Sequence, residues 1–178
     1  MSMKKWKIKK FLKYALLLVA ALFLYSVAFP QKVSMPVVGA SKKDYNRKSF
    51  WAHPWGKSGT HKGVDIFAKK GTRVNSPVKG RVVRVSSSEN GGKYVIVMDA
   101  KLRYHYLAHL DSITVKRGQK VNHSIQVGTV GNTGNAKGKP PHLHYAIVAT
   151  FPHFWKIDRS PQGWKKAIYL NPIRELEK

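Results

Sequence analysis

The sequence predicts an all-β domain behind a single N-terminal helix, and two observations carry this prediction. Between Gly63 and Val148, short runs rich in β-branched and aromatic residues alternate with turn residues, without the 3.6-residue period of an amphipathic helix. Residues 14–29 (YALLLVAALFLYSVAF) instead form one uncharged apolar run that Pro30 closes. The expected fold class is therefore an antiparallel β-sheet groove or sandwich preceded by one transmembrane or signal helix.

The first 30 residues are expected to lie outside the domain. Six lysines and no acidic residue precede the apolar run, whose 16 residues reach about 24 Å at 1.5 Å per residue. Phe11 and Leu12, with Lys13 snorkelling, extend the run towards the roughly 30 Å hydrocarbon core of a bilayer. A secretory signal has the same layout, here with small residues at 26–28. An uncleaved anchor or a cleaved signal is expected, and both send the remaining chain across a membrane while the lysines stay in the cytoplasm.

Composition excludes several classes of protein. The 178 residues include 33 Lys and Arg, 8 Asp and Glu and no Cys, for a formal net charge of +25. Without cysteine there is no disulfide framework, cysteine-based zinc finger or thiol nucleophile. The charge favours an anionic partner such as nucleic acid, a phospholipid surface or an acidic envelope polymer. Nucleic acid is excluded as a partner because an exported domain would not meet any.

The chain after the helix divides into three predicted segments. These are a linker over 31–50, the β domain over 51–150, and a C-terminal extension over 151–178 with a short helix around 164–170. The clearest strands expected in the domain are 81–85, 94–98, 103–107 and 142–148.

Two histidine patterns carry the predicted chemistry. His61 and Asp65 stand four apart, and the intervening glycine and valine favour an extended chain, which returns both side chains to one face. His142 and His144 stand two apart in a strand-like run and also share a face. Three histidines and one aspartate suffice for a catalytic zinc site, which uses three N or O ligands and leaves a position for water. Either pattern alone also occurs as alternate polar residues on a solvated sheet.

Four motifs resemble, in sequence, order and separation, the lysostaphin/LytM-type zinc metallopeptidases, which are peptidoglycan endopeptidases with a duplicated hybrid motif-like fold. These motifs are HKGVDI (61–66), YLAHL (106–110), GNTGNAKG (131–138) and PHLHYAI (141–147). The resemblance covers roughly residues 50–150 and implies that 51–150 is a zinc metallopeptidase domain. It implies one Zn²⁺ per chain held by His61, Asp65 and His144. It further implies that His109 and His142 are a catalytic pair outside the ligand set, with their separate roles open.

The resemblance implies a zinc metalloendopeptidase that hydrolyses peptide crosslinks of bacterial peptidoglycan through a zinc-activated water, and the N-terminal apolar run predicts that it is membrane-attached. A single-pass protein of the inner membrane with a periplasmic catalytic domain is expected, or a secreted protein if the signal is cleaved. A D,D-crosslink is preferred over a glycine bridge as the bond cut, and the oligomeric state and any activating partner are open. The alternative function is a catalytically inactive wall-binding regulator of another hydrolase. Such members of the family lack metal ligands, whereas all five site residues are present here.

Other conspicuous residues are interpreted structurally. Core packing is preferred over stacking on sugar rings for Trp51, Trp55, Trp155 and Trp164. Packing or surface positions are expected for His105, His123 and His153. The glycine-rich stretch 131–138 lacks a following Lys-Ser/Thr and is expected to form a flexible wall of the groove rather than a phosphate cradle. Some relatives carry a tyrosine upstream of the first ligand, where this chain has only Trp51, His53 and Trp55.

Overall fold

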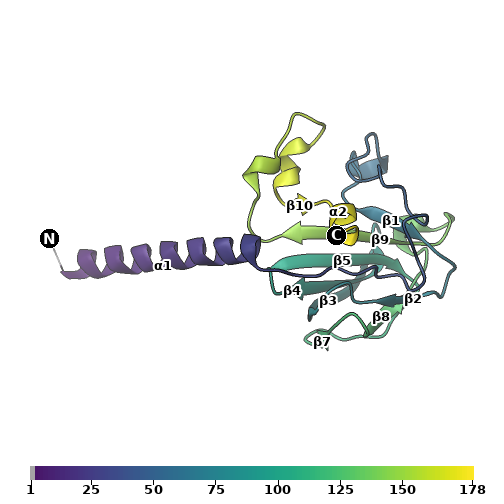
Figure 1. The fold of residues 1–178 in the computed structure, drawn as a ribbon, viewed down its shortest axis with the longest axis horizontal. Coiled ribbons are helices and arrows are strands. Elements are labelled where there is room, and N and C mark those ends of the chain that lie inside the picture. Colours follow the sequence, from purple (N-terminus) through teal and green to yellow (C-terminus); the bar gives the residue numbers. More distant parts are fainter. Residues whose placement is uncertain (1–2) are drawn as a thin grey trace.

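A computed structural model describes residues 3–178 and shows one long helix projecting from a β domain (Figure 1). Helix α1 (Met3–Ala28) contains 26 residues, and its section Trp6–Ala28 is long and apolar enough to cross a membrane, by length and composition alone. At 1.5 Å per residue this section spans about 35 Å. Pro30, which cannot donate a backbone hydrogen bond, lies two residues after the end of the helix. The predicted N-terminal apolar helix is confirmed.

The domain consists of two antiparallel sheets. Its strands are β1 (Val64–Phe67), β2 (Arg73–Asn75), β3 (Gly80–Ser88), β4 (Gly92–Asp99), β5 (Arg103–Leu110), β6 (Ser112–Ile113), β7 (Lys120–Val121), β8 (Gln126–Thr129), β9 (His142–Ala149) and β10 (Tyr169–Leu170). The larger sheet has the order β1-β9-β5-β4-β3-β7, with β10 also paired to β9, and the smaller sheet has the order β2-β8-β6. The predicted antiparallel all-β class is confirmed, and the four strands expected from the sequence lie within β3, β4, β5 and β9.

The core lies against one face of the larger sheet. In β9, Leu143, Tyr145 and Ile147 are fully buried, and they pack with apolar residues of β1, β4 and β5. Residues of the smaller sheet such as Val74 and Val127 belong to the same core cluster. Because side chains alternate along a strand, the residues between the core positions of β9 point to the opposite face of the sheet. That second face carries His144.

Residues 31–50, for which the sequence predicts a linker, run along the domain and contribute to its core. Val33, Val37 and Tyr45 are buried in the main apolar cluster. Val37 forms an isolated antiparallel bridge with Val74 of β2, and Asn75 donates its backbone N–H to the Pro36 carbonyl at 2.8 Å. In this structure the segment therefore packs as part of the fold.

The C-terminal segment contains two short helices. The 3₁₀ helix η4 (Gly163–Ala167) ends before β10, and the α-helix α2 covers Pro172–Leu176. The helix predicted over 164–170 is present over 164–167, but Tyr169 and Leu170 instead form a strand that pairs with β9. Asn171 caps α2 by accepting from the Ile173 N–H, and proline follows at the first helical position. This Asn-Pro pair is the start signal that the sequence reading missed.

A buried polar network joins β4, β5 and α2 at the end of the domain nearest α1. Asp99 accepts from the Arg103 guanidinium at 2.8 Å, and Arg103 also reaches Glu175 at 3.1 Å. His105 is fully buried between the Tyr145 hydroxyl (2.7 Å) and the Asp99 carboxylate (3.1 Å). As a neutral ring it donates to Asp99 and accepts from Tyr145. His105 is thus a packing residue, as predicted.

The burial of residues 31–50 predicts a contrast between two neighbouring valines. Val37 is 1% exposed and Val38 is 49% exposed. Val37→Ala removes buried methyl groups and leaves a cavity, at a cost of about 2 kcal/mol, which corresponds to a fall in Tm of about 4–8 °C. Val38→Ala should change the stability by less than about 0.5 kcal/mol. Thermal unfolding of the full-length protein in detergent measures both, and equal Tm values for the two variants would mean that the segment does not pack on the core.

A second prediction concerns acid stability. Burial lowers the pKa of His105 below its ordinary value of 6.5, outweighing the opposite effect of Asp99. The unfolded chain therefore binds a proton that the folded protein does not, and the stability contributed by the neutral ring is lost as the pH falls below about 6.5. His105→Gln cannot titrate, so its Tm should fall less between pH 7 and pH 5 than that of the unmodified protein. Parallel falls in both proteins, measured with chelator present, would contradict this role.

Candidate metal centre

The pairing of β1 with β9 brings three potential ligands together. Asp65 lies directly opposite His144 in the antiparallel register, and His61 enters from the loop before β1. The Asp65 Oδ1 atom is 2.7 Å from His144 Nδ1 and 3.2 Å from His61 Nε2, and the two ring nitrogens are 3.2 Å apart. All three atoms lie within 4.8 Å of one another, so they could hold a metal ion.

The donor set and its spacing suit a tetrahedral ion. Ligands 2.0–2.1 Å from a tetrahedral zinc stand about 3.3 Å from each other, close to the separations observed here. Burial alone would raise the pKa of Asp65, but the adjacent imidazoles of His144 and His61 outweigh burial and hold that pKa far below its ordinary value. The carboxylate therefore remains charged, as a ligand must. Two neutral imidazoles and one carboxylate are ligands that zinc accepts.

His61 is held with one nitrogen facing the other two ligands. Its Nδ1 donates to the Ser49 carbonyl at 3.0 Å, which leaves the lone pair of Nε2 towards Asp65 and His144. The Trp55 ring stacks on the imidazole with centroids 4.3 Å apart. A carbonyl partner of this kind fixes the tautomer and ring orientation of a metal-binding histidine.

A β-bulge turns His109 towards the same side of the sheet. The register between β4 and β5 shifts between Lys93 and Val95, so that β5 gains one residue just before its end. His109 takes a left-handed conformation, with φ of 63°. Without the extra residue His109 would share the core face of His105 and Leu107, since odd-numbered residues of β5 point inward there. Bulges commonly re-aim a side chain in this way next to active sites.

His109 and His142 form a second imidazole pair beside the three potential ligands. Their ring centroids lie 5.1 Å apart, and the His109 ring lies 5.9 Å from that of His144. His109 Nδ1 donates to the Thr133 carbonyl at 2.9 Å, and His142 Nδ1 donates to the Pro140 carbonyl at 2.8 Å. Burial, reinforced by His144 and His142, lowers the pKa of His109 to about 4. Because both Nδ1 atoms donate to backbone carbonyls, the lone pair of each neutral ring lies on Nε2.

These residues line a cleft of about 600 Å³. Its other lining residues include Trp55, Phe67, Asn90, Tyr106, Asn135, Ala136 and Pro140. Tyr106 was not predicted as a site residue. Its ring lies 6.2 Å from that of His144, and burial raises its pKa to about 12. Because it alternates with His105 and Leu107, which point into the core, the sequence indicated that its side chain lies on the opposite face of the sheet.

The remaining sequence expectations have mixed outcomes. Trp51 is buried, as expected, but Trp155 and Trp164 are well exposed, so core packing is the wrong prediction for both. The stretch 131–138 was predicted to form a wall of the groove, and two of its residues, Asn135 and Ala136, line the cleft. Upstream of His61, the Trp55 ring lines the cleft and is 40% exposed, so core packing is also the wrong prediction for this residue.

Two histidines and a carboxylate that line a cleft, beside two further imidazoles, form an arrangement that is typical of metal-dependent hydrolases. The model of peptidase family M23 matches residues 59–154, more than half of the chain. The chain belongs to this family. The lysostaphin/LytM resemblance stated from the motifs is thereby confirmed.

Relatives with assigned activities are longer than this chain. It is 34% identical over 140 residues to the L-Ala--D-Glu endopeptidase of Bacillus subtilis (strain 168), covering 72% of this chain and 43% of the relative. It is 36% identical over 88 residues to the peptidoglycan DD-endopeptidase ShyA of Vibrio cholerae, covering 49% of this chain and 20% of the relative. The chain thus spans less than half the length of either.

Solved structures agree with the fold. The catalytic domain of lysostaphin from Staphylococcus simulans is 26% identical with a TM-score of 0.56, covering 71% of this chain and 86% of that one. A zinc-containing peptidase from Vibrio cholerae is 26% identical with a TM-score of 0.54, covering 65% of this chain and 36% of that one.

The site predicts a strict requirement for glycine at position 63. A Cβ there would lie 2.6 Å from the Tyr145 carbonyl oxygen and 2.8 Å from His144 Nε2. Gly63→Ala should therefore push His144 away from Asp65 and lower the affinity of the site for zinc, which a competitive chelator titration measures. Lys62→Ala, at the preceding half-buried side chain, is the control, because it perturbs the same loop without adding an atom against His144. Unchanged zinc affinity in Gly63→Ala would contradict this close approach.

Proposed function

We propose that this chain is a membrane-anchored zinc metalloendopeptidase that hydrolyses peptide crosslinks of bacterial peptidoglycan. The convergence of His61 Nε2, Asp65 Oδ1 and His144 Nδ1 beside two further imidazoles carries the proposal. Membership of family M23 supports peptide hydrolysis, and relatives named as peptidoglycan endopeptidases support the substrate class.

His61, Asp65 and His144 are the proposed zinc ligands. When bound, zinc would polarise the scissile carbonyl and acidify a coordinated water. Its assignment rests on the neutral-imidazole and carboxylate donor set, and the zinc-containing structural relative supports it. The Ser49 carbonyl and the Trp55 ring hold His61 in the orientation that such a ligand needs.

His109 and His142 are the proposed acid–base pair. Both rings expose Nε2 beside His144 because their Nδ1 atoms donate to backbone carbonyls. An imidazole so placed takes a proton from the attacking water and returns one to the leaving amine. The second imidazole, when protonated, donates a hydrogen bond to the developing oxyanion. The Tyr106 hydroxyl, kept neutral by burial, is a further donor in the cleft.

An uncleaved anchor is proposed over a cleaved signal. The last turns of α1 contact the domain: the Phe23 ring lies 6.2 Å from those of Phe151 and Trp155, and the Lys101 Nζ donates to the Val27 carbonyl at 2.9 Å. A signal destined for removal would need no such contacts. With the N-terminal lysines in the cytoplasm, the domain lies on the outer side of the membrane, in the periplasm of a diderm host.

The proposed scissile bond is the D,D-crosslink. The relative named as a DD-endopeptidase supports this choice, whereas the relative named as an L-Ala--D-Glu endopeptidase favours a bond within one stem peptide. The two bonds yield different fragments. Mass spectrometry of digested crosslinked muropeptides distinguishes them.

A catalytically inactive wall-binding regulator is the competing function. It predicts that the cleft binds peptide without cutting it. The presence of all three proposed ligands, together with both flanking histidines, argues against this alternative.

Digestion of purified sacculi tests the proposed activity. The full-length protein in detergent should release soluble fragments, excess chelator should abolish the release, and added zinc should restore it. Fragment release that persists in excess chelator would overturn metal-dependent hydrolysis. Zinc-loaded protein that binds sacculi without releasing fragments would favour the regulator.

Substitutions at the two histidines of β9 should have different effects. His144→Ala leaves two proposed ligands, so both bound zinc and activity should be lost. His142→Ala should retain zinc while the rate falls by about 10²–10⁴-fold, the usual contribution of a general acid or base. His109→Ala should resemble His142→Ala, and the double variant should lose less than the product of the two if they act together.

Metal analysis beside sacculus digestion separates these outcomes. His123→Ala is a matched control, because it changes a histidine outside the cleft. Loss of zinc in His142→Ala with retention in His144→Ala would reverse the assignment. Unchanged metal and activity in both would place the site elsewhere.

A further inference from the structure

The C-terminal segment exposes a cluster of large apolar side chains. Phe154, Trp155 and Trp164 are each more than 60% exposed, and Ile157 is 47% exposed. Phe154 and Trp155 lie on one turn, the 3₁₀ helix η3 (Phe154–Lys156), and Trp164 lies on η4. We refer to residues 151–166 as the aromatic segment. The cleft chemistry uses none of these side chains.

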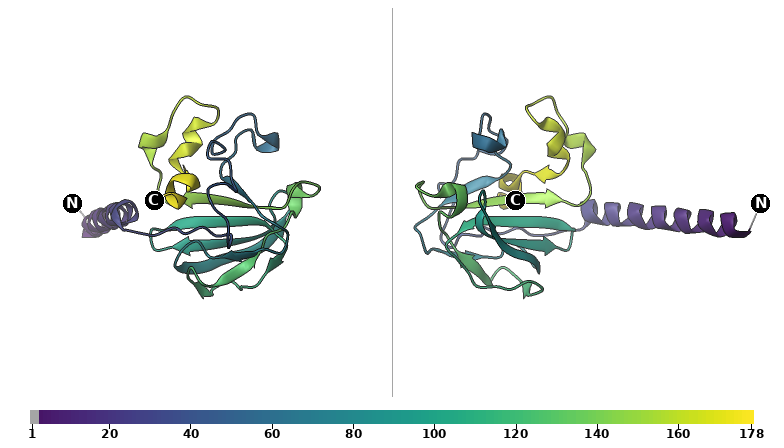
Figure 2. Two further views of the ribbon diagram at one scale, coloured as in Figure 1. Left: turned by 45° about the vertical axis from the view of Figure 1, so that its right-hand side comes forward. Right: turned by 180° about the vertical axis from the view of Figure 1, so that it is seen from behind.

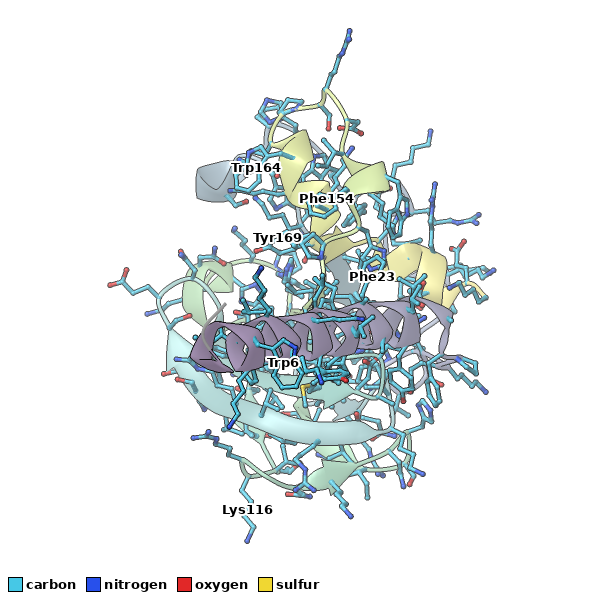
Figure 3. All side chains as sticks on the ribbon, turned by 90° about the vertical axis from the view of Figure 1, so that its left-hand side faces the viewer. Trp6, Phe23, Lys116, Phe154, Trp164 and Tyr169 are labelled. Atoms are coloured by element: carbon cyan, nitrogen blue, oxygen red, sulfur yellow. The ribbon has the colours of Figure 1, made fainter. Side chains whose placement is uncertain are left out.

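This segment lies beside the end of α1 that joins the domain. Phe23 meets the Phe151 and Trp155 rings edge-on, with interplanar angles of 85° and 76°. Figure 1 shows the segment rising next to the last turns of α1, and Figure 3 shows Phe154 and Trp164 from the side to which α1 projects. The aromatic segment therefore faces the same direction as the proposed membrane anchor.

The position of Phe23 along α1 sets the depth of these rings. Phe23 lies five residues before Ala28, the last residue of the helix, or about 8 Å along its axis. The polar interface on each side of a bilayer is about 5–8 Å thick, the difference between a 30 Å core and a total of 40–45 Å shared between two sides. If α1 spans the bilayer up to Ala28, Trp155 cannot remain in bulk water, because its ring touches a residue within the span.

The charge of the segment fits the same location. Its ionisable side chains, other than histidine, are Lys156, Asp158, Arg159, Lys165 and Lys166, four basic against one acidic. Tryptophan and phenylalanine beside lysine and arginine are the composition of protein surfaces that lie in the headgroup region. Basic residues near an anionic surface attract the protein to that surface.

We propose that the aromatic segment is a second membrane contact, which seats the domain against the anionic lipid headgroups around α1. The proposal rests on the membrane-anchored topology proposed above, but not on the catalytic assignment. It implies that the domain has one preferred orientation on the bilayer. The metal centre would then lie at the far end of β9, because His142 begins that strand and Ala149, next to the aromatic segment, ends it.

The absence of cysteine from the chain allows a direct test by site-directed spin labelling. Single-cysteine variants Phe154→Cys and Ile157→Cys of the full-length protein are labelled with a nitroxide and reconstituted into phosphatidylglycerol vesicles. Leu18→Cys reports whether α1 lies in the bilayer, and Lys116→Cys, at an edge of the domain away from the aromatic segment (Figure 3), is the aqueous control. Accessibility to oxygen is compared with accessibility to a water-soluble nickel complex.

The oxygen-to-nickel ratio should be several-fold higher at 154 and 157 than at 116, and highest at 18. It should fall at 154 and 157, but not at 18, when zwitterionic lipid replaces phosphatidylglycerol. A buried label at 18 with aqueous labels at 154 and 157 would overturn the second contact and leave the anchor intact. Aqueous labels at all positions would overturn both. Protection at 154 that appears only on addition of muropeptides would show that the segment binds the wall instead. Sacculus digestion is a separate measurement, so failure of the second membrane contact and failure of the proposed hydrolysis can be told apart.

Discussion

The antiparallel pairing of β1 with β9 is the constraint on which the candidate metal centre depends. It places Asp65 opposite His144, with both side chains on the face away from the core. The register is held from the other face, where Val64, Ile66 and Leu143 are fully buried. A slip of one residue would turn the potential ligands inward and the apolar residues outward. The hydrophobic core therefore fixes the geometry of a site that contains none of its residues.

The flanking histidines need two further departures from a regular sheet. His109 reaches the cleft through the bulge in β5 and a left-handed backbone conformation. His142 begins β9 and is tied to Gly131 by an isolated bridge, while the Pro140 carbonyl orients its ring. The loop that follows Gly131 also supplies the Thr133 carbonyl that holds His109. One loop thus orients both members of the proposed acid–base pair, which explains why their rings lie next to each other in an edge-to-face arrangement.

The sequence could predict those features that depend on local periodicity. The alternation within β9 and the even spacing of His61 and Asp65 indicated which polar side chains could share a face, and the family resemblance selected His61, Asp65 and His144 among them as potential ligands. The inward turn of Tyr169 and Leu170 onto β9, in contrast, is a long-range pairing that overrides the apparent local helix. Burial of Val37 likewise depends on Val74, which is far along the chain. The exposure of Trp155 was unpredictable for the same reason, because it depends on where the end of α1 meets the domain.

The two loops that rise above the sheet on the same side support each other (Figure 2). One carries η1 (Gly56–Ser58) and leads into His61, and the other is the aromatic segment. The Gln162 amide donates to the Ser58 carbonyl at 2.9 Å, and the Trp51 indole donates to the Pro161 carbonyl at 3.0 Å.

The loop before His61 has little regular structure of its own. Its backbone pairing consists mainly of the Trp55–Gly59 bridge and the hydrogen bonds that join Trp51 and Ala52 to His61 at its base. The contacts to the aromatic segment therefore add support where the sheet supplies none. Trp55 in this loop stacks on His61, the first proposed ligand. The position of His61 therefore depends on the aromatic segment, which follows the end of β9 opposite to His142. The C-terminal extension is thus a structural support of the candidate metal centre, even though none of its side chains lines the cleft.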